Sequence, residues 1–204
     1  MKLFAKECTV FVSNEVLSPP RSVKINIFEE YTILEKSQTH EVSEYSWVDT
    51  VRYRDKIITR SKKRVLIVYF KKRSSFALFS NSESDVAFVI RKFNEIFSLS
   101  FTKKNVFDEL VSLLQSNNHN TKFHDIASIQ FRTSLDNDIE KDFTVELADK
   151  NLKELDFLLN STDIMNLNLI TNSWFQFDLD CTSVFSFHDN SNLEEIIDVL
   201  ESYI

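Results

Sequence analysis

The sequence predicts an α+β protein with mostly antiparallel β-structure, in which each of two modules ends in an amphipathic helix. Three observations support this prediction. Apolar and polar residues alternate through most of the first 80 positions, as they do in half-buried strands. The period then changes to three and four residues over 86–97 and again over 192–204, as in helices that bury one face. The two helical patterns also superimpose on one another.

The first module covers residues 1–100 and begins with strands. Its strand patterns are rich in β-branched and aromatic side chains, and Pro19-Pro20 marks a loop between the first two. A turn is expected at Thr59–Ser61, directly after the longest of these patterns. Ser82 or Ser84 is the expected N-cap of the closing helix. The predicted strands are residues 8–12, 23–34, 42–58, 64–70 and 75–79.

Residues 101–122 are predicted to hold a second helix, over 104–115, and a polar linker. The second module covers residues 123–204 and closes with the helix at 192–204. The stretch 152–159 fits either a short helix or a strand. The strand patterns of this module are Ile126–Phe131, Phe143–Leu147, Leu167–Leu179 and Ser183–Phe187.

A shift of 107 residues places every apolar position of the first closing helix on an apolar position of the second. The strand before each helix also matches, which favours an internal duplication over a chance likeness of two amphipathic helices. The six matched pairs are Val86 with Leu193, Val89 with Ile196, Ile90 with Ile197, Phe93 with Leu200, Ile96 with Tyr203, and Phe97 with Ile204.

A run of strands closed by one amphipathic helix resembles the pleckstrin-homology (PH) superfold. In the first module the strands Val65–Phe70 and Phe76–Phe79 and the helix Ser84–Phe97 carry the resemblance. It implies a bent seven-stranded sheet plugged by the helix, and therefore two PH-like modules in tandem. Because the second module has fewer early strands before Trp174–Phe177, it is either a degenerate copy or a different α+β unit.

The resemblance also implies the kind of partner. Tandem modules of this type bind proteins in histone chaperones and in transcription, repair and recombination complexes, whereas single copies bind phosphoinositides at membranes. The lipid-binding members usually carry basic residues in the loop between their first two strands. Here that loop, Ser13–Ser22, contains Arg21 as its one basic residue, so membrane lipid is the less favoured partner.

The net charge of −7 conceals a marked asymmetry. Residues 1–100 carry 17 basic and 12 acidic side chains, which gives +5, whereas residues 101–204 carry 7 basic and 19 acidic side chains, which gives −12. Such a split indicates two surfaces with different partners, or halves that attract each other.

The basic residues concentrate between positions 52 and 73, opposed by Asp55 alone. Because Arg52, Arg54 and Lys56 alternate, they are predicted to share one strand face, and Lys62 and Arg64 alternate in the same way after the expected turn. The pattern predicts a basic stripe for an anionic partner: nucleic acid, an acidic protein segment or lipid. The alternative is a solvated face that discourages aggregation. The stripe comprises Arg52, Arg54, Lys56, Arg60, Lys62, Lys63, Arg64, Lys71, Lys72 and Arg73.

The chain contains no glycine, where average usage of about 7% would give roughly fourteen. Glycine-dependent sites such as the P-loop, the Rossmann fingerprint and the nucleophile elbow are therefore excluded, and we expect a non-catalytic protein. Positive-φ turns must use Asn, Asp or Ser instead. AT-rich codon bias is the favoured cause of the missing glycine, with the same consequence for chemistry.

Other residues give no catalytic or metal site. The four histidines are scattered, and Asp136, Asp138 and Glu140 resemble a calcium loop without its turn glycine. Asp178 and Asp180 alternate on a strand and are expected on a solvated face; the alternative is a carboxylate pair of a glycine-free hydrolase. We therefore predict no cofactor and no metal.

Cys8 and Cys181 lie far apart in the sequence and are expected to be buried free thiols. No run of 18 apolar residues and no signal peptide is present, so we expect an intracellular protein, nuclear or cytoplasmic. The sequence thus predicts a scaffold subunit of a chromatin- or DNA-associated complex, or a peripheral membrane adaptor that binds phosphoinositides.

Overall fold

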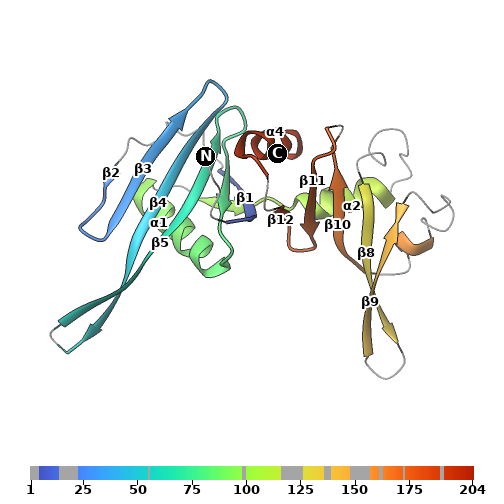
Figure 1. Ribbon diagram of the computed structural model, residues 1–204, viewed down its shortest axis with the longest axis horizontal. Helices are drawn as coiled ribbons and strands as arrows, with labels where there is room; N and C mark the ends of the chain where they lie inside the picture. Colours follow the sequence, from blue (N-terminus) through green and yellow to red (C-terminus); the bar gives the residue numbers. More distant parts are fainter. Residues whose placement is uncertain are drawn as a thin grey trace. The chain divides into compact units, whose positions relative to one another are not determined.

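The computed structural model describes residues 5–13, 23–54, 56–97, 100–115, 126–135, 139–147, 157–160, 163–171, 173–188 and 191–204. At residues 23, 24, 51–53, 56, 57, 60, 97, 134, 135 and 139 the backbone alone is described. The chain divides into an N-terminal unit, Phe4–Lys104, and a C-terminal unit, Asn105–Tyr203 (Figure 1). Both units combine antiparallel strands with helices, which confirms the predicted α+β class.

The N-terminal unit is built on one antiparallel sheet in the order β2-β3-β4-β5-β6-β1, with β7 also paired to β1. Strands β2 to β6 follow one another as a meander, and β1 joins next to β6. Helix α1 lies against one face of this sheet (Figure 1). The elements are β1 Glu7–Ser13, β2 Val23–Lys24, β3 Glu29–Lys36, β4 His40–Tyr53, β5 Lys56–Phe70, β6 Ser75–Phe79, α1 Glu83–Phe97 and β7 Phe101–Lys103.

The core between α1 and the sheet is aromatic. Alternating residues of the strands point toward the helix, because successive side chains of a strand lie on opposite faces. The ring of Phe93 lies near the centre, where it meets Tyr31 and Phe76 edge-on. The buried cluster comprises Tyr31, Tyr45, Trp47, Val65, Ile67, Tyr69, Phe76, Leu78, Val86, Val89 and Phe93.

Helix α1 begins as predicted. The backbone N–H of Asp85 donates to Ser82 Oγ at 3.4 Å, and that of Val86 donates to the Ser82 carbonyl at 3.1 Å, so Ser82 is the N-cap. Lys92 on the helix lies 3.2 Å from Glu29 of β3, and Glu29 also accepts the Tyr45 hydroxyl at 2.9 Å. These polar contacts fix the helix to the sheet at the edge of the core.

The strands of the C-terminal unit pair antiparallel in the order β12-β11-β10-β8-β9. The rings of Phe177 and Phe185 contact Tyr203 of α4, so α4 covers the apolar face of this sheet. Residues 157–160 form a helical turn, which resolves the ambiguous stretch within its described part. The elements are α2 Val106–Gln115, β8 Ile126–Leu135, β9 Ile139–Glu146, β10 Asp163–Ile170, β11 Gln176–Asp180, β12 Val184–Phe187 and α4 Leu193–Tyr203.

Three predicted strand boundaries are wrong. The pattern over 42–58 spans two strands, because the chain reverses between Tyr53 and Lys56 and runs straight through Thr59–Ser61 within β5. The pattern over Leu167–Leu179 is also two strands, separated by a turn in which Trp174 N–H donates to the Thr171 carbonyl at 2.9 Å. Residues 23–34 divide into β2 and the start of β3. In each case the alternation continues across a turn that carries no glycine.

Left-handed backbone occurs at four described residues, none of them asparagine: Arg54, Ser74, Trp174 and Ser183, with φ of 54°, 48°, 62° and 58°. The predicted use of serine is confirmed at two of these, whereas the described Asn81 and Asn160 have no positive φ. A Cβ in this region is strained by roughly 1 kcal/mol relative to glycine.

We expect Ser74→Gly to stabilise the protein by about 0.5–1 kcal/mol, because it removes this strain at a half-buried turn residue. Ser183→Gly is expected to destabilise, since Ser183 Oγ accepts the Phe107 N–H at 3.0 Å and donates to Asn105 Oδ1 at 2.9 Å. Urea denaturation of both variants measures the difference. Equal shifts in the same direction would contradict this account.

Alkaline unfolding is expected from the buried tyrosines. Burial raises the pKa of Tyr31 to about 12 and raises the pKa of Tyr45, whose hydroxyl also donates to Glu29. The folded state therefore holds these protons more tightly than the unfolded chain, where the tyrosine pKa is about 10. The resulting stability is complete below pH about 10 and is lost as the pH rises through about 12. Tyrosinate absorbance and circular dichroism are expected to change together over this window, whereas early tyrosinate formation without unfolding would argue against it.

Candidate anion-binding arm

A two-stranded arm extends from the sheet of the N-terminal unit. Strand β3 pairs with β4 as far as Trp47, the Val48 N–H donates to the Phe28 carbonyl, and β6 pairs with β5 from Leu66 onward. Between these limits β4 and β5 pair with each other alone among the described strands, and the hairpin leaves the sheet (Figure 1). We call residues 49–62 the arm. Because about half of these residues lie on each strand, at about 3.3 Å per residue, the arm is about 20 Å long.

The arm contains a β-bulge at its base. Val48 pairs with Lys62 and Thr50 pairs with Thr59, so Arg60 and Ser61 together oppose Asp49. A bulge of this kind strengthens the local twist and shifts the alternation of one strand relative to its partner. The side chains that share one face of the arm therefore cannot be identified by continuing the inward and outward alternation of the strands in the sheet.

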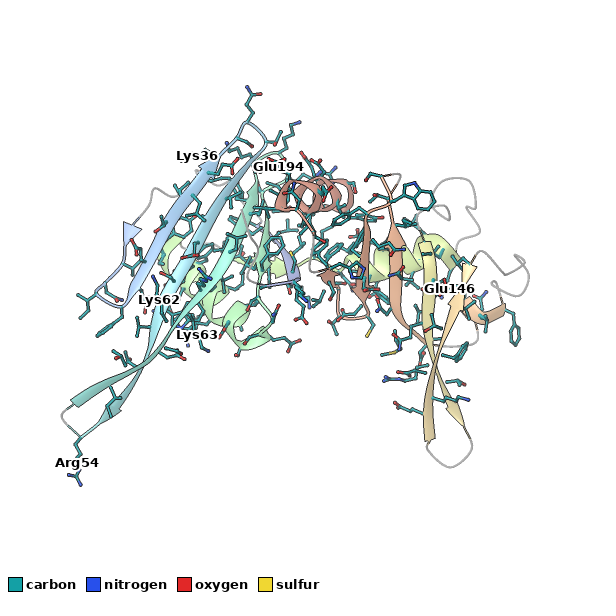
Figure 2. The ribbon with its side chains drawn as sticks, in the orientation of Figure 1. Lys36, Arg54, Lys62, Lys63, Glu146 and Glu194 are labelled. Carbon is teal, nitrogen blue, oxygen red and sulfur yellow. The ribbon has the colours of Figure 1, made fainter. Side chains whose placement is uncertain are left out.

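The described side chains of the arm are largely in water. Arg54 sits in the turn at the tip, and Lys62 lies near the base (Figure 2). Both are exposed, as are Thr59 and Ser61, and Ile58 is 49% exposed. The arm carries five basic residues and two acidic ones, which gives a net charge of +3.

Two further basic residues lie at the base of the arm and are already engaged. Lys63 Nζ lies 2.8 Å from Asp85 in α1 and 3.5 Å from Asp49, and the hydrogen bond to Asp85 raises the pKa of Lys63. Arg64 lies 3.9 Å from Glu44 of the adjacent strand. Lys63 therefore ties the base of the arm to the helix rather than offering its charge to a partner.

The remaining three predicted residues lie at the opposite end of β5. Lys71 donates to the Ser37 carbonyl, and Lys72 and Arg73 are exposed in the turn before β6. The 15-residue length of β5 places them about 45 Å from its start. In Figure 2 Lys36 marks this end of the sheet and Arg54 the other.

The structure thus divides the predicted stripe into three groups. The arm holds Arg52, Arg54, Lys56, Arg60 and Lys62, its base holds Lys63 and Arg64, and the distal turn holds Lys71, Lys72 and Arg73. The prediction of one continuous basic stripe is wrong, because Arg54 lies in the turn and not on a strand between Arg52 and Lys56. The side chains of Arg52, Lys56 and Arg60 lie outside the described residues.

The C-terminal unit carries a polar sheet face that the sequence analysis did not identify. Asn168 Nδ2 donates to Asp178 Oδ1 at 2.9 Å, and Arg132 makes a bidentate pair with Asp142 at 2.8 and 3.1 Å. This pairing lowers the pKa of Asp142. The alternation of Asn166, Asn168, Asp178 and Asp180 was the available signal, although only the last two were noted.

Asp178 and Asp180 are half-buried and lie on the strand face opposite the buried Phe177 and Leu179. Asp180 Oδ1 accepts the backbone N–H groups of Thr182 and Val184 at 2.8 and 2.9 Å, which shapes the turn between β11 and β12. Cys8 is buried, and burial raises its thiol pKa, whereas Cys181 is exposed in the same turn, contrary to expectation.

Neither the scattered histidines nor the acidic loop contributes a described site. Within the described ranges no group of three or more His, Cys, Asp or Glu side chains could hold a metal ion. His119, His124, Asp136 and Asp138 lie outside these ranges. His40 Nδ1 forms a hydrogen bond with the Thr39 hydroxyl at 3.1 Å and thereby supports the β3–β4 turn.

No family model and no curated protein matches the chain. None of the helices in the described part of the chain is long and apolar enough to cross a membrane. The candidate site therefore depends on geometry and charge alone.

Proposed function

We propose that this chain is a non-catalytic interaction subunit that binds an anionic partner through the arm. The observation that supports this proposal is that the arm leaves its sheet and bears five basic residues among fourteen. A two-stranded ribbon with both faces in water is marginally stable by itself. A binding role accounts for such a ribbon better than solvation does, because solvation alone needs no projection beyond the sheet.

The same proposal includes the type of module and the cellular complex to which the protein belongs. An antiparallel sheet closed by a helix supports PH-like modules, and both units contain a hairpin followed by a helix, β5–β6 with α1 and β11–β12 with α4. This supports the tandem arrangement expected of protein-binding scaffolds. We place the protein inside the cell, in a nuclear, DNA-associated or chromatin-associated complex.

Charge reversal on the arm tests the proposal. We expect Arg54→Glu with Lys62→Glu to elute from immobilised heparin at clearly lower salt than the wild-type protein and to lose co-purifying partners. Lys72→Glu with Arg73→Glu is the matched control, because it makes the same charge change at exposed residues of the distal turn. If both double variants elute alike, net charge rather than the arm governs binding.

The distal turn supports one alternative, a peripheral adaptor that binds phosphoinositides. Lys71, Lys72 and Arg73 are consecutive basic residues in the turn between β5 and β6, and such a cluster can attract anionic head groups. Flotation with phosphoinositide vesicles distinguishes the alternatives. The adaptor requires flotation that the Lys72 and Arg73 variant abolishes and the arm variant retains.

A further inference from the structure

We propose that the anionic partner of the arm is duplex nucleic acid and that the arm enters its major groove. This inference rests on the proposed function and specifies its ligand. It depends on three properties of the arm: its width, its charge and one exposed apolar side chain.

The width of the arm selects the groove. Two paired strands lie about 4.8 Å apart, and their side chains extend the ribbon to roughly the 12 Å width of the major groove of B-DNA. The minor groove of undeformed B-DNA is narrower, at about 6 Å, so a two-stranded ribbon enters it only where the duplex is bent or widened. Because β3 and β6 pair no farther than the base of the arm, no described strand widens the ribbon along its length of about 20 Å.

The shape of the arm disfavours a lipid head group as its ligand. A lipid head group needs a concave site with converging donors, whereas the arm is a projection with Arg54 at its tip (Figure 2). A groove has phosphates along both of its edges, so a basic projection that enters it meets negative charge on two sides. Arg52 and Arg54 come from the first half of the hairpin, and Lys56, Arg60 and Lys62 come from the second.

Ile58 adds an observation that charge alone does not explain. It lies within this basic segment and is 49% exposed. An aliphatic side chain cannot contact a phosphate favourably, but in the major groove it meets the C5-methyl group of thymine. The arm thus combines cations for the backbone with an apolar contact for a base edge.

Fluorescence anisotropy of the full chain tests the inference, with a labelled duplex of about 20 base pairs that contains A·T steps. If all five cations meet phosphates, log K against log salt has a slope of about −4.5, equivalent to about 500-fold weaker binding between about 50 and 200 mM salt. We expect Arg54→Glu with Lys62→Glu to reduce this slope by about 2 and the affinity by more than tenfold. The Lys72 and Arg73 control is expected to retain the wild-type slope.

Ile58→Ser separates groove entry from backbone association. We expect it to weaken duplex binding by roughly 3- to 10-fold while the salt slope stays constant, because it removes a base contact and no charge. Near-ultraviolet circular dichroism verifies that each variant retains its tertiary structure. An Ile58→Ser protein that binds duplex as tightly as wild type overturns groove entry.

Competition identifies the ligand class. Duplex that competes better than its single strand or heparin at equal phosphate or sulfate concentration supports the inference. Equal competition, with all binding lost in the arm variant, overturns the duplex assignment while the proposed anion-binding function stands. Unchanged binding of the arm variant to every ligand overturns both. Binding to phosphoinositide vesicles without duplex binding overturns the inference in favour of the lipid adaptor.

Discussion

Phe93→Ala is expected to lower the free energy of unfolding of the N-terminal unit by about 3–5 kcal/mol, the largest effect of any single substitution considered. Phe93 is 1% exposed, and its ring centroid lies 5.7–6.1 Å from those of Tyr31, Tyr45, Phe76 and Phe101. Removing the ring creates a cavity where α1 meets three strands and β7. The neighbouring rings cannot fill it without moving the helix.

Ile96→Ala is the matched control for Phe93. Ile96 lies one turn later on the same helix but is 38% exposed, so its loss is expected to cost about 1 kcal/mol or less. Urea denaturation followed by fluorescence reports on the same core, because Trp47 is 4% exposed within it. Equal destabilisation by the two substitutions would show that α1 contributes helix stability rather than core packing.

The second large effect concerns one ion pair, in which the two partners are expected to respond in opposite ways. Glu41 is 1% exposed, Lys36 Nζ lies 3.1 Å from its Oε2, and neither carboxylate oxygen accepts a hydrogen bond within the described residues. Lys36→Met leaves a buried charge unpaired, and we expect a loss of about 1–3 kcal/mol. The lysine side chain is 53% exposed, so solvent limits the loss to this range.

Glu41→Leu removes the buried charge itself. The ammonium group of Lys36 then stays hydrated at the surface, and we expect this variant to be as stable as wild type or more stable. Chemical denaturation at neutral pH measures both variants. Arg91→Met, which breaks an exposed pair with Glu95, is expected to change stability by less than about 0.5 kcal/mol. Strong destabilisation by Glu41→Leu would show that the carboxylate has a structural role that the pair does not explain.

Sequence periodicity was sufficient to predict the helices and most of the strands. The helices at 86–97, 104–115 and 192–204 were found because burial of one face imposes a period that few other structures share. β7 was missed because three residues carry no period. The position of β1 beside β6 could not be predicted either, since pairing between distant segments leaves no local pattern.

Turns were the main source of error, and the missing glycine is the physical reason. The chain reverses at Arg54 and at Trp174, two residues that do not ordinarily mark turns. Alternation therefore continued across both reversals. The residues of the candidate site could be chosen from charge alone, but their division between the arm, its base and the distal turn depends on where β3 and β6 stop pairing.

The arm also has a consequence for how binding can be observed. Its hydrogen bonds join β4 only to β5, so they can open without disturbing the sheet or the core beneath α1. Backbone amides in residues 49–62 are therefore expected to exchange with solvent far faster than those of the paired strand Leu66–Phe70, through local opening rather than global unfolding. A ligand that binds the arm is expected to slow exchange at those amides and to leave the others unchanged. Amide exchange in the arm can therefore be used to detect partner binding without a label.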